Sequence, residues 1–292
     1  MRSARRRRAR MRVRRLSGTS VNRMVPNILT LLALCAGMTA MRFAMGGNFV
    51  AAVFSIIAAG IFDGLDGRMA RLLKATSSFG AELDSLSDFV SFGVAPAAVL
   101  YLWTLSELHG FGWAIALLFA VCCALRLARF NTESPGELPS YAAPFFTGAP
   151  APAGAGLVMV PMFLSFEWGD WLFRSPYLNA VTVTSIALLM ISKVPTVSLK
   201  RIRIPHHMVI PTLLAFGVAT GFLTTEPWLT LIAVGIVYVG SIPLTIRSYL
   251  RLKRAAQARK AEATMKPEPV SLPTPTALPL GETNVPSTEW RH

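Results

Sequence analysis

The sequence predicts an all-α, polytopic integral membrane protein with about eight transmembrane helices. Hydrophobic residues make up 53% of the chain, charged residues only 15%, and the mean hydropathy is +0.49. Soluble globular domains are ordinarily about 25% charged, so this composition places the chain outside that class. The apolar residues are gathered in long stretches, and basic residues follow alternate stretches, which is typical of a chain that crosses a bilayer repeatedly.

The predicted spans are apolar stretches of about 17 to 25 residues, the length that an α-helix needs to cross roughly 30 Å of hydrocarbon. Eight stretches come close to this length. In chain order they are residues 27–45, 48–73, 80–104, 110–130, 149–166, 177–194, 207–224 and 228–247.

The composition divides the chain into three parts. Residues 1–22 are an arginine-rich arm that is too polar to span a bilayer, and we expect it to lie on anionic headgroups at the cytoplasmic surface. Residues 23–254 hold all eight spans and form the membrane domain. Residues 255–292 carry six prolines without hydrophobic periodicity, so we expect a disordered cytoplasmic tail.

The net charge of +14 is explained by membrane topology, because basic residues mark the cytoplasmic side of polytopic proteins. Threading eight spans from a cytoplasmic N-terminus places only two of the 29 basic residues, Arg42 and Arg174, at the outer ends. This predicts a multi-pass protein of the cell membrane with both termini in the cytoplasm. An arm that binds nucleic acid is the alternative, but it is not needed to explain the charge, so we expect no nucleic-acid partner.

Four aspartates lie within 26 residues at the junction of the second and third spans. Asp63 shares one helix face with four residues at helical spacing, namely Asp66, Gly67, Ala70 and Arg71. In the third span, Gly80, Asp84 and Asp88 follow one another at intervals of four. If the two helices face each other, four carboxylates converge, and cations must offset their repulsion. The sequence therefore predicts a metal site, which the topology places on the cytoplasmic side.

Helix capping is the alternative explanation for these aspartates. It suits Asp84 alone, because aspartate is a good N-cap. It does not suit Asp63 and Asp66, because a carboxylate near a helix C-terminus opposes the helix macrodipole. The histidines and cysteines are scattered away from the aspartates without paired spacing, so we expect neither a zinc site nor a disulfide.

The pattern D-x-x-D-G-x-x-A-R-x8-G-x-x-x-D-x-x-x-D, filled at every fixed position from Asp63 to Asp88, resembles the signature of the CDP-alcohol phosphotransferase family. Within that family, the segments F-D-G-L-D-G-R-M-A-R and F-G-A-E-L-D-S-L-S-D-F-V-S-F-G-V-A-P are most like phosphatidylserine synthases of the bacterial and archaeal type. The segments P-N-I-L-T-L and R-L-A-R-F-N point the same way. The looser similarity extends over roughly residues 1–155.

The resemblance implies that residues 23–254 are a catalytic domain that transfers a phosphatidyl group from CDP-diacylglycerol to the hydroxyl of L-serine, giving phosphatidylserine and CMP. It implies two divalent cations, Mg or Mn, which suit an all-carboxylate site. Their implied ligands are Asp63, Asp66, Asp84 and Asp88. Asp88 is also the candidate general base. The CDP moiety is expected against three residues of the second span, Gly67, Ala70 and Arg71.

The acceptor site is expected at the cytoplasmic end of the fourth span, because serine brings a carboxylate that needs a cationic partner. The candidate residues are Arg126, Arg129 and Asn131, with Lys193 and Arg201 as further candidates. Positive-inside topology is the competing explanation for the two arginines. The resemblance also implies a homodimer.

Two alternative functions remain open from the sequence. The first keeps the chemistry and replaces serine by glycerol 3-phosphate, inositol phosphate or choline. The second is a cation transporter that uses intramembrane aspartates as ion ligands, for which inverted repeats and broken helices would be expected.

Overall fold

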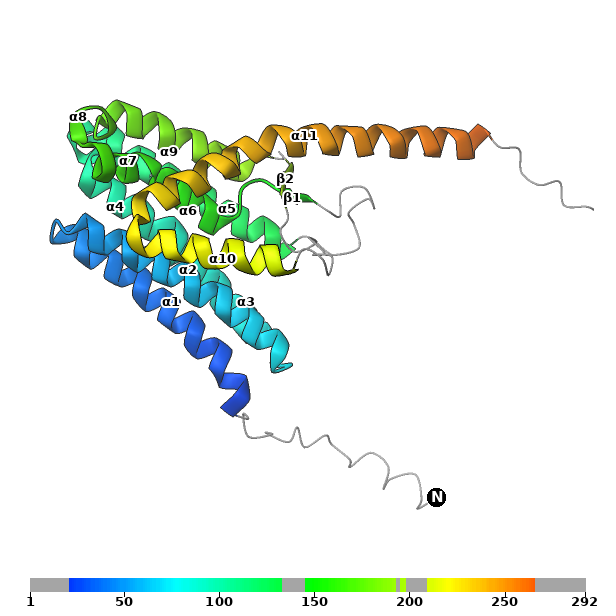
Figure 1. Cartoon of the computed structure of the whole chain (residues 1–292), viewed down its shortest axis with the longest axis horizontal. Coiled ribbons are helices and arrows are strands. Elements are labelled where there is room, and N and C mark those ends of the chain that lie inside the picture. The colour runs from blue at the N-terminus through cyan, green and yellow to red at the C-terminus, as the bar shows by residue number, and fades with distance from the viewer. Residues whose placement is uncertain (1–20, 133–144, 193–194, 198–208, 266–292) are drawn as a thin grey trace, which may run out of the picture.

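A computed structural model of the chain describes residues 21–132, 145–192, 195–197 and 209–265 (Figure 1). The described residues form helices and a single pair of short strands. Most of the predicted arm and tail lie outside them, namely residues 1–20 and 266–292, and so do residues 133–144. Lys193 and Arg201 also lie outside the described residues.

The first two spans form an antiparallel helical hairpin. α1 (Val21–Met45) and α2 (Phe49–Leu72) pack along each other and are joined by a tight turn in which Gly47 has a φ of +76°. The Asn48 side chain caps α2 by accepting a hydrogen bond of 3.0 Å from the backbone N–H of Ala51. α2 continues to Leu72, so both aspartates of the second span lie inside a regular helix.

The third span is continuous and consists of three helical segments. α3 (Ser78–Asp88) is followed by a π-helical segment (Phe89–Val94) and then by α4 (Ala95–Trp103). Pro96 has no N–H for the carbonyl four residues earlier and would clash with it in a regular α-helix. The wider π-turns absorb this misfit, with the N–H of Ala95 bonded to the carbonyl of Val90. The unbroken helix expected over 80–104 is thus interrupted directly after Asp88.

The fourth and fifth spans continue the bundle beyond a short 3₁₀ turn (Leu105–Leu108). α5 (Gly110–Thr132) is regular, whereas the fifth span is broken into α6 (Ala151–Val158) and α7 (Val160–Trp168). Pro161 explains the break, because it removes a donor and crowds the carbonyl four residues earlier. The predicted span 149–166 therefore consists of two short helices.

A short polar turn follows the fifth span. α8 (Asp170–Phe173) leads into α9 (Pro176–Ile191). Asp170 accepts hydrogen bonds from the hydroxyl of Ser165 and from the guanidinium of Arg174, and these contacts, the first foremost, hold the pKa of Asp170 below its usual range. The Thr104 hydroxyl donates to the Arg174 carbonyl at 2.7 Å, which ties this turn to the end of the third span.

The two strands, which the sequence did not predict, join segments that are about 50 residues apart. β1 (Phe145–Thr147), after α5, pairs antiparallel with β2 (Pro195–Val197), after α9, with Phe146 opposite Thr196. Arg129 in the last turn of α5 also donates to the carbonyl of Ile191 at 2.8 Å. The ends of α5 and α9 therefore lie on the same side of the bundle.

The last two helices are α10 (Val209–Thr225) and α11 (Pro227–Met265). α11 extends past the end of the bundle (Figure 1). The helix continues beyond the predicted boundary at residue 254 to Met265, so the start of the expected disordered tail is helical. Residues 255–265 are rich in alanine, lysine, arginine and glutamate, which are strong helix formers.

Among the described residues, six helices are long and apolar enough to cross a membrane. They are Met24–Met45, Phe49–Leu72, Ser78–Trp103, Gly110–Thr132, Ala151–Trp168 and Pro227–Leu252. The other two predicted spans correspond to the shorter helices α9 and α10, with 16 and 17 residues. The structure thus confirms an all-helical protein with several potential crossings, six of which meet the length criterion.

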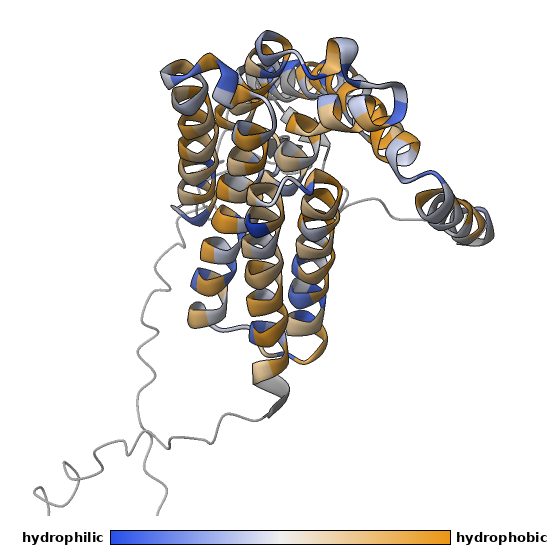
Figure 2. Ribbon diagram, turned by 90° about the vertical axis from the view of Figure 1, so that its left-hand side faces the viewer, coloured by the Kyte–Doolittle hydropathy of each residue, from blue (hydrophilic) through white to orange (hydrophobic). Residues whose placement is uncertain are grey.

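Many small residues are buried between the helices, and many large apolar residues face outward. Ala40, Ala52 and Ala59 are fully buried, whereas Leu72 and Val237 are more than 70% exposed. Figure 2 shows that apolar residues dominate the bundle helices. This distribution fits a protein whose outer surface meets lipid, where small residues let helix backbones approach closely.

Candidate functional site

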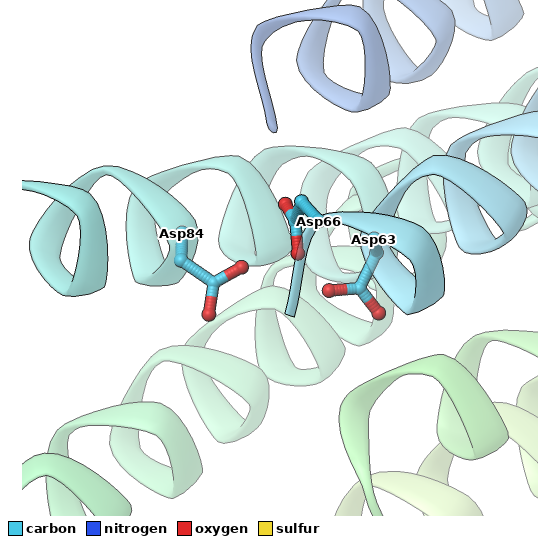
Figure 3. A group of neighbouring side chains, drawn as sticks. All are labelled: Asp63, Asp66 and Asp84. Carbon is cyan, nitrogen blue, oxygen red and sulfur yellow. The ribbon is translucent and has the colours of Figure 1, made fainter. Parts of the chain in front are cut away.

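Two neighbouring helices bring three of the four aspartates together. Asp63 and Asp66 project from the C-terminal half of α2, and Asp84 projects from α3 (Figure 3). Each of the three offers one oxygen, and these oxygens lie within 4.8 Å of one another. Oxygen ligands of one cation, at about 2.0 to 2.6 Å from it, lie no more than about twice that distance apart. The three carboxylates are thus close enough to ligate a shared ion.

The fourth aspartate lies deeper in the third span. Asp88, the last residue of α3, is not part of this three-residue group. Its carboxyl is near enough to the Asp63 carboxyl for the two groups to interact. The predicted convergence of four carboxylates is therefore confirmed for three, with Asp88 next to one of them.

α1 supplies the third wall of the site. The Thr30 hydroxyl donates a hydrogen bond of 2.6 Å to Asp66 Oδ2, and both residues are buried. Ser87 donates to the backbone carbonyl of Thr30 at 3.0 Å, and Ser91 donates to the carbonyl of Ala33 at 3.1 Å. These bonds tie both aspartate-bearing helices to α1.

A cavity of about 340 Å³ opens beside the aspartates. Its walls come from α1, the end of α2 and the start of α3. Asp66 and Asp84 line it, and so do the three residues that the sequence predicted for CDP, which are Gly67, Ala70 and Arg71. A Cβ atom added at Gly67 would meet nothing within 4 Å, so this glycine faces open space and is not required by helix packing.

Gly80, the remaining glycine of the pattern, has a different local role. A Cβ atom there would lie 3.1 Å from Asn27 Oδ1 and 3.1 Å from Ser77 Oγ. Ser77 caps α3 by accepting a hydrogen bond from the N–H of Gly80 at 3.0 Å. Gly80 thus permits the close approach of α3 to α1 at the mouth of the cavity.

The three predicted acceptor residues lie on α5, next to the third span, and have different environments. Arg126 is close enough to Asp88 for their charges to interact, and its buried Nε has no hydrogen-bond partner among the described residues. Arg129 is engaged by the Ile191 carbonyl, and Asn131 donates to the Ser85 hydroxyl at 2.9 Å. Arg126 therefore lies within electrostatic reach of the deepest aspartate, Asp88.

Sequence reasoning missed the contribution of α1. Asn27 and Thr30 line the cavity, and Thr30 holds Asp66. A signal was present, because these two polar residues lie three positions apart, on one face of an otherwise apolar helix. Their partners on the other helices are not visible from that spacing.

The sequence profile described as CDP-alcohol phosphatidyltransferase matches residues 23–239. The chain belongs to this family. The match covers more than half of the chain and includes both aspartate-bearing helices, so the family membership inferred from the signature is confirmed.

Several relatives are CDP-diacylglycerol–serine O-phosphatidyltransferases. The Mycobacterium tuberculosis protein is 39% identical over 226 residues, which are 77% of this chain and 79% of that relative. The Bacillus subtilis protein is 35% identical over 170 residues, covering 58% of this chain and 88% of the relative. The Methanocaldococcus jannaschii protein is 38% identical over 170 residues, covering 58% and 72%.

Proposed function

We propose that this CDP-alcohol phosphatidyltransferase moves a phosphatidyl group from CDP-diacylglycerol to the hydroxyl of L-serine, giving phosphatidylserine and CMP. The observation that carries the proposal is the cavity at the aspartate cluster, bordered by the open backbone at Gly67 and by Arg71. Relatives that are 39% identical to this chain over 226 residues carry the name of this activity.

Two divalent cations, Mg or Mn, fit the carboxylate donor set, because hard cations prefer oxygen ligands. Their proposed ligands are Asp63, Asp66, Asp84 and Asp88. When bound, such ions polarise the pyrophosphate and offset the charge that develops on CMP. The three-residue cluster supports a first ion, and the position of Asp88 beside Asp63 supports extension of the site to a second.

The donor nucleotide is proposed to lie in the cavity against α2. Gly67 and Ala70 leave room for the cytidine directly against the helix backbone, and Arg71 supplies a guanidinium that can hold phosphate oxygens in a bidentate manner. The acyl chains then remain in lipid beside the apolar outer surface of the bundle.

In the proposed chemical step, Asp88 accepts the proton of the serine hydroxyl. The hydroxyl oxygen then forms a bond to the phosphatidyl phosphorus, and the bond from that phosphorus to the bridging oxygen of CMP breaks. Arg126 is the proposed partner of the serine carboxylate, because its guanidinium is near Asp88 and its Nε has no other hydrogen-bond partner in the described part of the chain. Arg129 and Asn131 are proposed to shape the same pocket.

We propose eight crossings, with both termini and the site on the cytoplasmic side of the cell membrane. Pairing of β1 with β2 requires the ends of α5 and α9 to lie on one side. If α6–α7 crosses outward, α9 must therefore cross back, although its 16 residues span only about 24 Å at 1.5 Å per residue. α10 and α11 then form a hairpin that crosses the membrane twice, so that both termini lie on the same side. A homodimer is proposed on the family resemblance alone.

Product analysis tests the acceptor. Purified protein in nanodiscs is given CDP-diacylglycerol with one labelled alcohol at a time: L-serine, glycerol 3-phosphate, inositol phosphate or choline. We expect label to enter lipid only with L-serine, together with stoichiometric CMP. Label entering lipid from another of these alcohols, and not from serine, contradicts the serine assignment while leaving the family chemistry in place.

A further inference from the structure

We propose that Thr30 is a positioning residue, whose hydroxyl fixes the Asp66 carboxylate in the orientation that binds a divalent cation. This inference rests on the metal site of the proposed function. It assigns a role to α1, a helix that carries none of the aspartates.

The hydrogen bond from Thr30 to Asp66 is short, at 2.6 Å, and shielded from water. The two residues are 4% and 5% exposed. A hydroxyl that donates to a carboxylate makes a charge-assisted bond, which is stronger than a bond between neutral groups. Holding one carboxylate oxygen in this way restricts rotation of the carboxylate and leaves its other lone pairs for a cation.

The ordinary role of threonine in an apolar helix is to donate to the carbonyl four residues earlier. Thr39, in the same helix, does only this, with a distance of 2.7 Å to the Cys35 carbonyl. The Thr30 hydroxyl lies 3.1 Å from the Pro26 carbonyl and 2.6 Å from Asp66. Because the hydroxyl has a single proton, it can donate a strong hydrogen bond to only one of these acceptors. The Asp66 carboxylate is favoured, because it is nearer and charged.

Thr30 also connects α1 to the helix that carries Asp84. Its backbone carbonyl accepts the hydrogen bond from Ser87, one turn after Asp84 in α3. The same residue thus contacts α2 through its side chain and α3 through its main chain. A substitution of the side chain alone separates these two roles, because the carbonyl remains.

The test measures Mn²⁺ affinity by electron paramagnetic resonance, on the full chain in zwitterionic nanodiscs without substrate. Thr30→Val and Thr30→Ala both remove the hydroxyl but differ in volume, Thr30→Ser retains it, and Thr39→Val is the matched control. Loss of a hydrogen-bond partner of a metal ligand typically costs about 10- to 100-fold in affinity. We expect that loss in the first two variants and near wild-type affinity in the other two.

Asp84→Asn separates failure of this inference from failure of the metal site. If the wild type binds Mn²⁺ and Asp84→Asn does not, unchanged affinity in Thr30→Val and Thr30→Ala overturns the role of Thr30 alone. If Thr30→Ser binds Mn²⁺ as weakly as Thr30→Val, the role of Thr30 is also overturned. The retained hydroxyl would then not be what supports Mn²⁺ binding. If the wild type binds no Mn²⁺, or Asp84→Asn binds it equally well, the metal site and this inference both fail.

Discussion

At Gly67, helix packing and substrate binding are two explanations for the glycine, and they predict different effects of a substitution. Its backbone faces the cavity, with nothing within 4 Å of an added Cβ atom. Gly67→Val should therefore leave the free energy of unfolding nearly unchanged while it fills the space proposed for the donor. Overpacking costs about 1 to 3 kcal/mol, so we expect the KM for CDP-diacylglycerol to rise about 5- to 150-fold.

Gly64→Val is the matched control for that measurement. Gly64 lies on the same helix, also faces open space, and does not line the cavity. Its substitution should leave the KM for the donor unchanged. Equal KM values for the wild type and Gly67→Val would show that the cytidine does not lie against this part of α2.

Arg126 and Arg129 are one helical turn apart but have different partners. Arg126→Gln should raise the KM for serine about 10- to 150-fold, because a hydrogen bond to a charged group contributes about 1.5 to 3 kcal/mol. Arg129→Gln should instead lower the free energy of unfolding, because it removes the bond to the Ile191 carbonyl. Initial rates at varied serine measure the first effect, and reversible unfolding in a detergent titration measures the second. A serine KM unchanged by Arg126→Gln contradicts the proposed contact.

At the scale of single residues, the sequence spacing of the aspartates predicted which of them could lie close together, because i, i+3 and i+4 positions share a helix face. It did not predict that Arg129 and Asn131 have partners elsewhere in the fold. Their partners, Ile191 and Ser85, are 62 and 46 residues away, and no local pattern links such pairs.

At the scale of secondary-structure elements, the close contact of α1 with the third span depends on Gly37. A Cβ atom there would lie 2.8 Å from the backbone Cα of Ser91. Because a backbone atom cannot move aside cheaply, Gly37→Ala should lower the free energy of unfolding by about 1 to 3 kcal/mol. Reversible unfolding in a detergent titration measures the change.

Gly240→Ala serves as the control, because nothing lies within 4 Å of its added Cβ atom. Alanine favours the helix over glycine by roughly 0.5 to 1 kcal/mol, so this variant should be as stable as the wild type or slightly more stable. If Gly37→Ala were equally stable, α1 and the π-helical segment would not pack as closely as described.

The positions of the spans followed from hydropathy, but their interruptions did not. Pro96 and Pro161 lie inside predicted spans, and prolines are tolerated in membrane helices through several local adjustments. Sequence alone does not select among them. At Pro96 the helix widens into π-turns, whereas at Pro161 the span divides into two helices.

Across the whole molecule, the pairing of β1 with β2 makes a prediction about topology. Single cysteines are introduced as Tyr177→Cys and Thr196→Cys, after replacement of Cys35, Cys122 and Cys123 by alanine. Tyr177 lies in the first turn of α9 and is 73% exposed, whereas Thr196 follows α9. If α9 crosses the membrane, a membrane-impermeant maleimide applied outside intact cells should label only the first. Labelling of Thr196→Cys from outside contradicts eight crossings.

The overall class was the most predictable feature, because a chain with 53% hydrophobic residues has few folds open to it. The helical extension of α11 to Met265 was not predicted, because the prolines that follow dominated the composition of the tail. The β1–β2 pair was not predicted either, because each strand has only three residues.

The central claim is that Asp63, Asp66 and Asp84 carry phosphatidyl transfer together with divalent cations. The most direct measurement is serine-dependent CMP release from CDP-diacylglycerol by chelator-treated protein, before and after Mg²⁺ or Mn²⁺ is restored. We predict no release without metal, recovery in the wild type and in the control Asp170→Asn, and a loss of at least about 100-fold in Asp84→Asn. Metal-independent release, or equal release by Asp84→Asn and the wild type, would contradict the claim.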